Sequence, residues 1–352
     1  MPARLPAGIL RRVSSLRTRP APGAVGARDE RPVLVVGSAL ADLIVAVPDL
    51  PRRGGHTWAE PVAESNGGTG LNVLRAVVAL GAAPLSALAV GSGPRGERIA
   101  QEVRALGAAL PDGAPSLLPR HPGDNGLCLT LITPDGERTF VTTPGCEMDW
   151  SAPRLAALDD ALAALDDALP SAPEAAPLRP VVYASGFQLL ARGHHLMSWL
   201  EGLDATVVVD PGGRVADLAA DADLRRRLLA RTDVLAANEE EADALLAAHL
   251  ETPTTAPERL DALCRLATAT GTDIVLRQGA EGATWVPADG TRVLSAPAVP
   301  VEVVDTDGAG DAHTAGVLVG LARGLPPARL LALANASAAR VVAGRGPQGL
   351  RA

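Results

Sequence analysis

The chain has 352 residues, of which 47% are hydrophobic and only 2% aromatic, so a sizeable core must be built from Ala, Val and Leu. Its net charge of −8 argues against a general nucleic-acid binder, and no apolar run reaches the length of a membrane span. The sequence contains no lysine, which excludes a Walker A phosphate loop and any Schiff-base lysine enzyme.

The three cysteines, Cys128, Cys146 and Cys264, lie far apart and form no CxxC pair. This spacing favours buried thiols in a reducing compartment over a disulfide or zinc framework, and it predicts a cytoplasmic protein. Residues 1–31 are rich in Arg, Pro and Ala without a continuous apolar segment. We therefore expect a disordered extension rather than a secretory signal, followed by one domain over residues 32–352.

A predicted strand over 33–36 is followed by Asp42, which stands just before a second apolar run over 43–47. An acid between apolar stretches is either a turn residue or a carboxylate with a ligand, because buried acids need partners. Next, NGGTGLNVLRAVVALGA begins with Gly67 and Gly68, reaches Asn72 and continues with apolar residues at helical spacing. This pattern predicts a glycine loop that leads into a helix.

A predicted strand over 85–90 runs into GSGPRG, which is formally a G-x-G-x-x-G motif with Asp112 near the offset typical of dinucleotide-binding folds. Two observations count against that function. Asp112 is not preceded by a second apolar strand, and Pro94 and Arg95 stand where the helix should approach a pyrophosphate. An NAD(P) oxidoreductase that uses Gly91 to Gly96 is therefore a less favoured alternative.

Apolar runs over 127–132 and 138–142 flank Pro134-Asp135-Gly136, which predicts a hairpin. Downstream, strands predicted over 181–184, 206–209, 234–236 and 274–276 alternate with helices near 193–203, 215–230, 239–250 and 257–269. This alternation predicts an α/β fold with a mostly parallel sheet. Ligands of such sheets lie at the carboxyl ends of the strands.

Two polar stretches follow strands of this series. Asn238 to Glu241 reads N-E-E-E and begins a helix, where Asn is a preferred N-cap and Glu suits the first turn, so capping alone can explain it. RQGAEG then follows the next strand and contains Gly279 and Gly282, which predict a tight turn.

The stretch VEVVDTDGAGDAHTAGVLVGLARG, residues 301–324, combines three local signals. We predict a buried strand over 301–304, a turn permitted by Gly308 and Gly310, and a helix that ends at Gly324. Asp311 falls in the first helical turn. Free N–H groups and the helix dipole form an anion site there, and an anion site beside a base suggests phosphoryl transfer to a hydroxyl. A capped helix after a strand is the simpler alternative.

DTDGAGD resembles the C-terminal signature D-T-x-G-A-G-D of the ribokinase-like (PfkB-type) family of carbohydrate and nucleoside kinases. Gly67, Gly68, Asn72 and Leu80-Gly81 resemble its N-terminal signature, and Asn238 with Glu241 its N-x-x-E motif. The resemblance covers roughly residues 32–350. It implies a doubly wound, mostly parallel sheet with helices on both faces and a small β lid, for which segments near 43–65 and 124–143 are candidates. A homodimer through this lid is a further hypothesis.

The resemblance also implies roles for individual residues. Asp311 would be the catalytic base, and the N–H groups of the following turn residues would stabilise the transferring phosphoryl: Gly308, Ala309 and Gly310. The residues that would contact the sugar are Asp42, Gly67, Gly68 and Asn72. Those that would contact ATP are Asn238, Gly279, Gly282 and Asn335. Glu241 would bind Mg²⁺ through water, and a monovalent cation, K⁺, would lie at Asp305, Val341, Gly344 and Gly346.

The activity implied is ATP-dependent transfer of the γ-phosphoryl to a hydroxyl of a ribose- or fructose-like sugar, with Mg²⁺ neutralising charge in place of a lysine. A nucleoside kinase on the same fold is the main alternative. A non-catalytic sugar-binding regulator is less favoured, because Asp311 and the glycine turn are intact. The sequence does not separate these substrates, since their selection depends on lid and loop residues that follow no code.

Overall fold

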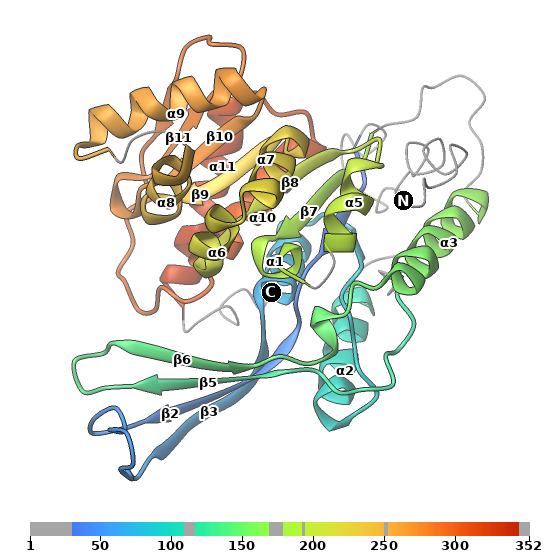
Figure 1. Ribbon diagram of the computed structural model, residues 1–352, viewed down its shortest axis with the longest axis vertical. Helices are drawn as coiled ribbons and strands as arrows, with labels where there is room; N and C mark the ends of the chain where they lie inside the picture. Colours follow the sequence, from blue (N-terminus) through green and yellow to red (C-terminus); the bar gives the residue numbers. More distant parts are fainter. Residues whose placement is uncertain (1–29, 109–116, 169–178, 192–193, 250–252, 345–352) are drawn as a thin grey trace.

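The computed structural model describes residues 30–108, 117–168, 179–191, 194–249 and 253–344 (Figure 1). Most of the predicted N-terminal extension, residues 1–29, and Asp112 and Gly346 lie outside the described residues. No helix in the described ranges combines the length and hydropathy needed to cross a membrane.

Eight strands form the main sheet, in the order β12-β11-β10-β9-β8-β7-β1-β4. The pairs from β4 to β9 and the β9–β10 pair are parallel, and β11 and β12 are antiparallel at one edge. The strands of this sheet are β1 (Val33–Val36), β4 (Pro84–Ser86), β7 (Val181–Ser185), β8 (Thr206–Asp210), β9 (Val234–Asn238), β10 (Asp273–Arg277), β11 (Ala283–Val286) and β12 (Leu294–Ala296).

Helices cover both faces of this sheet, because its central strands are apolar on both sides. One core contains Val33, Val35 and Tyr183, and it is covered by α1 (Thr69–Ala79), α2 (Pro94–Ala108), α10 (Ala309–Ala322) and α11 (Pro327–Val342). The other core contains Leu34 and Val36. It is covered by α3 (Ala152–Ala168), α4 (Gly186–Leu189), α5 (His195–Glu201), α6 (Val215–Ala220), α7 (Ala222–Arg231), α8 (Glu239–His249) and α9 (Ala256–Thr270). The predicted α/β architecture with two helical layers is therefore confirmed.

A second, smaller sheet has the order β3-β2-β5-β6 and extends away from the layered body (Figure 1). Its strands are β2 (Leu40–Ala46), β3 (Glu60–Gly67), β5 (Leu127–Ile132) and β6 (Arg138–Thr143). The two segments predicted as a lid form these strands. The predicted hairpin turn is also present, since the Gly136 N–H donates to Thr133 O at 2.8 Å.

Three predicted elements differ from the structure. The run over 301–304 is not a strand: Val303 is 66% exposed, and the Val304 N–H donates to Val342 O of α11 instead of to a sheet neighbour. The strand predicted over 85–90 ends at Ser86. The helix predicted over 215–230 is two helices, because Asp221 ends the first and its side chain caps the second by accepting from Leu224 N. Cys128 and Cys146 are buried as predicted, but Cys264 is only partly buried.

Helices α10 and α11 approach each other closely at Gly316. A Cβ added to Gly316 would lie 2.4 Å from Ala334 Cα, which is backbone and cannot move aside as a flexible side chain can. Gly316→Ala should therefore lower the free energy of unfolding by about 1–3 kcal/mol, despite alanine's higher helix propensity. Urea denaturation measures this effect. Gly213→Ala is the control, since its added Cβ would meet only Phe187, at 3.9 Å. Equal stability of Gly316→Ala and the wild type would show that the two helices can separate at no cost.

Candidate active site

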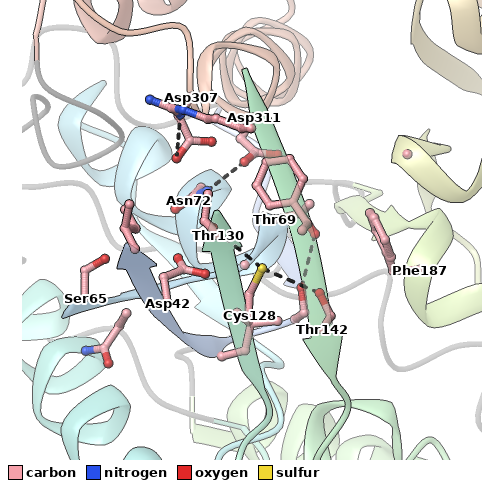
Figure 2. A pocket seen from close by; sticks show the side chains of 18 of the residues that line it. Asp42, Ser65, Thr69, Asn72, Cys128, Thr130, Thr142, Phe187, Asp307 and Asp311 are labelled. Atoms are coloured by element: carbon pink, nitrogen blue, oxygen red, sulfur yellow. Dashed lines mark hydrogen bonds and ion pairs between the residues drawn. The ribbon is translucent and has the colours of Figure 1, made fainter. Parts of the chain in front are cut away.

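A cavity of about 1340 Å³ lies between the smaller sheet and the carboxyl ends of the main sheet. Asp42 and Thr130 enter it from the smaller sheet, Asn72 from α1, and Phe187 from α4 on the far wall (Figure 2). Asp307 and Asp311 close one end. The cavity thus brings together residues from the first 72 and the last 50 positions of the chain, as expected for the carboxyl end of a parallel sheet.

The turn before α10 is built as the sequence predicts. Gly308 has φ 73°, a left-handed conformation that favours glycine, and it is the N-cap of α10. No side chain caps this helix end. The Ala309 N–H, however, donates to Thr306 O at 3.2 Å, so it is committed to the turn. The turn therefore has fewer free N–H groups than predicted, at the end of the cavity that Asp307 and Asp311 line.

Asp311, in the first turn of α10, is the most perturbed carboxyl at this end of the cavity. Burial raises its pKa to about 7, the Asn72 hydrogen bond opposes that rise, and the nearby Asp210 carboxylate adds to it. Asn72 Nδ2 donates to Asp311 Oδ2 at 2.8 Å, as the dashed line in Figure 2 shows. A carboxyl with a pKa near 7 and one fixed hydrogen bond can accept a proton at neutral pH.

Asp42 is held over a glycine. It lies on β2, and a Cβ on Gly67 would stand 1.7 Å from its Oδ2, so only glycine leaves room for the carboxylate. Burial raises the pKa of Asp42 to about 7, Asp307 adds to the rise, and Arg75 opposes it. Gly68 has φ 97° and precedes α1. Asp42, Asn72 and the two glycines therefore converge on one side of the cavity.

Arg138 links the smaller sheet to the α10 turn, and sequence reasoning did not find it. Its Nη2 donates to Asp305 Oδ1 at 2.8 Å, and its Nη1 lies 3.8 Å from Asp307 Oδ2. Arg138 is the first residue of β6, so the pair joins that hairpin to the turn. This contact also gives Asp307 a structural partner. The only sequence signal was two acids in the turn and an arginine beside a predicted hairpin.

A second arginine, Arg277 at the end of β10, lies directly behind the turn. Its Nη1 donates to Asp210 Oδ2 at 2.5 Å and to Thr314 Oγ1 at 3.0 Å, and its Nη2 donates to Glu241 Oε2 at 2.8 Å. Burial would lower the pKa of Arg277, but the two carboxylates outweigh burial and raise it. Sequence reasoning named the glycines after this arginine and missed the arginine, although a charge that ends an apolar strand is a usable signal.

The predicted N-x-x-E motif forms a reciprocal cap. The Glu241 N–H donates to Asn238 Oδ1 at 2.8 Å, and the Asn238 N–H donates to Glu241 Oε2 at 2.9 Å. Burial and the neighbouring Asp210 raise the pKa of Glu241. The structure thus shows the capping role and places Glu241 in the Arg277 cluster.

The other predicted nucleotide-contacting residues gather at the β12 edge of the main sheet, outside the cavity. Gly282 has φ 101°, and its backbone lies against residues 296–298. Asn335 Nδ2 donates to Ala296 O at 3.0 Å and Pro297 O at 2.9 Å, and its Oδ1 lies 3.1 Å from His313 Nε2. Gly279 lies in the turn before Gly282. The Asn335 amide is therefore occupied by the backbone of residues 296–297.

Residues predicted to hold a monovalent cation already have partners. Asp305 Oδ1 accepts from Arg138 and from the Asp307 N–H, and Val341 O accepts from the Gly344 N–H at 3.0 Å. Among the described residues, no group of three acidic, histidine or cysteine side chains could hold a metal ion. Gly346, the last residue of the predicted cation site, lies outside the described residues, so this site stays a prediction.

The competing G-x-G-x-x-G motif is filled by a side chain. Asp124 Oδ1 accepts from the Gly96 N–H at 2.8 Å, and Asp124 also lies against Gly93, where a Cβ would stand 2.4 Å from its Cγ. The Gly91 N–H donates to Asn125 Oδ1 at 2.7 Å. Carboxylate and amide oxygens therefore occupy the N–H groups that a pyrophosphate would need. This arrangement counts against the oxidoreductase alternative.

Comparison with known proteins agrees with this geometry. The family model of the pfkB family carbohydrate kinases matches residues 31–351. The chain is 36% identical over 324 residues to the uncharacterized sugar kinase YegV of Escherichia coli (strain K12). The aligned region covers 89% of each chain. Two solved structures share the fold. The ribokinase of Arabidopsis thaliana complexed with ribose and ATP has a TM-score of 0.68 at 22% identity, over 91% of this chain and 95% of that one. The Burkholderia thailandensis nucleoside kinase in complex with inosine has a TM-score of 0.67 at 20% identity, over 90% and 93%.

The raised pKa values of Asp42 and Asp311 predict a pH-dependent gain in stability when either charge is removed. Each folded-state pKa is about 7 against a model value of 3.8, so the folded state binds protons that the unfolded state has lost. Stability therefore falls as pH rises from about 4 to 7. Asp42→Asn and Asp311→Asn should each stabilise the protein by about 1–2 kcal/mol at pH 8, and by nothing below pH 4.

Thermal unfolding at pH 4 and pH 8 measures this difference. Asp261→Asn is the control, because the Asp261 side chain is 69% exposed on α9. Asn variants that melt at or below the wild-type temperature at pH 8 would contradict the raised pKa values.

Proposed function

This chain belongs to the pfkB family of carbohydrate kinases, and we propose that it transfers the γ-phosphoryl group of ATP to a hydroxyl of a sugar bound in the cavity beneath the smaller sheet. The observation that carries the proposal is the placement of Asp311. Its carboxyl stands in the first turn of α10, next to the uncapped helix N-terminus and at the end of the cavity. A base and an anion site therefore meet where an acceptor hydroxyl would lie.

In the proposed reaction, the acceptor oxygen forms a bond to the γ-phosphorus as the bond between that phosphorus and the β–γ bridging oxygen breaks. Asp311 takes the proton of the hydroxyl, and ADP leaves. The Gly310 N–H and the positive end of α10 would stabilise charge on the transferring phosphoryl. Asp311 needs only to be ionised at the start, and a pKa of about 7 allows that at neutral pH.

Sugar recognition falls to the side of the cavity opposite the phosphates. Asp42 accepts hydroxyl hydrogen bonds, and a carboxylate can accept from two neighbouring hydroxyls. Gly67 and Gly68 let the substrate approach the backbone. Asn72 offers a polar amide at the cavity wall next to Asp311. These residues are proposed to orient the sugar so that one hydroxyl faces Asp311.

Phosphate binding falls to backbone, arginine and metal, because the chain has no lysine. Mg²⁺ that arrives with ATP would neutralise charge on the phosphates, keeping most of its water and needing few protein ligands. Glu241 would contact such water, although its Oε2 already accepts from Arg277 and from the Asn238 N–H. Arg277 adds a fixed positive charge behind the turn. Because Asp305 is paired with Arg138, we assign no step to a monovalent cation.

A nucleoside is the second candidate acceptor, favoured by one observation. Phe140 of β6 and Phe187 of α4 both line the cavity, and an aromatic lining suits a nucleobase as well as a sugar ring. The Burkholderia relative is a nucleoside kinase in complex with inosine. The cavity volume admits either substrate class.

The direct test is ADP release with Mg²⁺ and ATP across a panel of pentoses, hexoses and nucleosides. One strong responder is expected, and its class identifies the acceptor. Asp311→Asn should then lower kcat by about 10²–10⁴-fold, because the base is lost while the helix N-terminus remains. Its ATP affinity, measured by calorimetry, should stay near that of the wild type. Turnover within threefold of wild type in this variant would contradict the proposed mechanism.

We propose that the smaller sheet closes over the sugar, and we expect the ion pair of Arg138 with Asp305 to stabilise the closed position. The Arg138–Asp305 pair is partly exposed, with side chains 32% and 20% accessible, so its contribution should be about 1 kcal/mol. Arg138→Met should raise the KM of the acceptor about fivefold, with kcat changed less. Salt should raise KM in the wild type and not in the variant. Glu137→Gln, on the same hairpin, is the control. A salt response that persists in Arg138→Met would assign the effect to other charges.

A further inference from the structure

Arg75 is a buried charge that the proposed reaction does not use. It lies on α1, one turn after Asn72, and its side chain is only 6% exposed. Its Nε donates to Glu102 Oε1 at 2.7 Å, its Nη2 donates to Asn66 O at 2.8 Å, and its Nη1 donates to Asn72 Oδ1 at 2.8 Å. The planar guanidinium is thus fixed by acceptors from α2, β3 and α1.

These contacts leave the Asn72 amide one favourable orientation. Oδ1 faces the guanidinium, so Nδ2 must face Asp311, where it donates at 2.8 Å. A flipped amide would turn its NH₂ toward the positive Arg75 and its oxygen toward the Asp311 carboxylate. Both contacts would then be repulsive, and two buried groups would lose their partners. Arg75 therefore determines which end of Asn72 meets the base.

We propose that Arg75 is a positioning residue of the phosphoryl transfer: it fixes the Asn72 amide in the orientation that donates a hydrogen bond to the Asp311 carboxylate. This inference rests on the proposed function. In it, Asp311 must be ionised and aimed at the acceptor hydroxyl before transfer begins. A hydrogen bond to the carboxylate favours its charged form and restrains its rotation. Without Arg75, the Asn72 amide is free to rotate and that hydrogen bond is made for only part of the time.

The groups around Asp311 act on its pKa in opposite directions. Asp210 of β8 and Asp307 of the turn disfavour its ionisation, and Arg277 of β10 favours it. The Tyr183 hydroxyl of β7 is buried nearby and is not ionised, because burial raises its pKa well above the usual value. Among the described residues, the neutral donor that opposes the effect of burial on Asp311 is Asn72. Removing Arg75 should therefore raise the pKa of Asp311 and move the acid limb of the kcat profile to higher pH.

Arg75 also ties β3 to α1 and α2, since Asn66 Nδ2 shares Glu102 with it. A purely structural role would lower stability and activity without acting through Asn72. A double-mutant cycle separates the two roles. Arg75→Met should lower kcat about 10- to 100-fold when Asn72 is present. In an Asn72→Ala background the same substitution should change kcat less than about threefold.

Two readouts complete the test. ¹³C NMR of aspartate carboxyls, with Asp311→Asn to assign the signal, should show the Asp311 pKa higher in Arg75→Met and Asn72→Ala than in the wild type. This readout needs no turnover, so it decides the role of Arg75 even if the panel of acceptors gives no ADP and the proposed function fails. Arg227→Met is the matched control, because Arg227 pairs with Glu201 between two helices far from the cavity, at 2.8 Å. It should leave both the profile and the pKa unchanged.

Equal losses of kcat in both backgrounds, or an Asp311 pKa that Arg75→Met leaves in place, would overturn the proposal. If Arg75→Met does not fold, as circular dichroism would show, Arg75→Lys enters the same cycle. Its ammonium keeps the buried positive charge but cannot serve all three acceptors in one plane. The lysine variant should show a smaller rise in the Asp311 pKa and a smaller shift of the kcat profile. A lysine variant with the wild-type pKa and profile would count against the proposal.

Discussion

Carboxylates crowd the carboxyl end of the main sheet, and the rest of the site depends on how their charge is offset. Six carboxylates line the cavity, among them Asp42, Asp305, Asp307 and Asp311. Asp210 and Glu241 lie behind the turn. With no lysine in the chain, every fixed counter-charge is an arginine. A guanidinium reaches several acceptors in one plane, so charge balance and geometry are set by the same side chains.

Three arginines near the cavity each join elements that are distant in the sequence. Arg75 joins α1, α2 and β3, Arg138 joins the smaller sheet to the α10 turn, and Arg277 joins β10 to β8, α8 and α10. The compensation is incomplete, since Asp42 and Asp311 retain pKa values of about 7. An acid held in so unfavourable a place lowers stability, and in return it can exchange a proton at neutral pH.

The sequence was informative wherever chemistry is local. The glycine turn before α10, the cap formed by Asn238 and Glu241, and the hairpin at Gly136 each follow from a few neighbouring residues. Contacts between distant residues were beyond it: Asn72 and Asp311 are 239 positions apart, and Arg138 and Asp305 are 167 apart. No propensity or period encodes such pairs. Arg75 did leave a signal, as a charge among the apolar positions of a predicted buried helix.

The strand predicted over 301–304 was wrong for a different reason. β-Branched residues favour a strand only where a sheet neighbour is available. Here the sheet edge ends at β12, and the segment bonds to the end of α11 through the Val304 and Asp305 N–H groups. The α/β order, in contrast, was predictable because alternating apolar strands and amphipathic helices leave few other arrangements.

The smaller sheet is one hydrogen-bonded unit, because the parallel β2–β5 pair joins its two hairpins. Such a unit cannot adapt strand by strand to the outline of a ligand. If this sheet closes over the sugar as proposed, its four strands would therefore move together. A substrate too large for the cavity would then keep Arg138, at the start of β6, away from Asp305 and Asp307. The size of the substrate would thus determine whether the ion pair between the smaller sheet and the α10 turn forms.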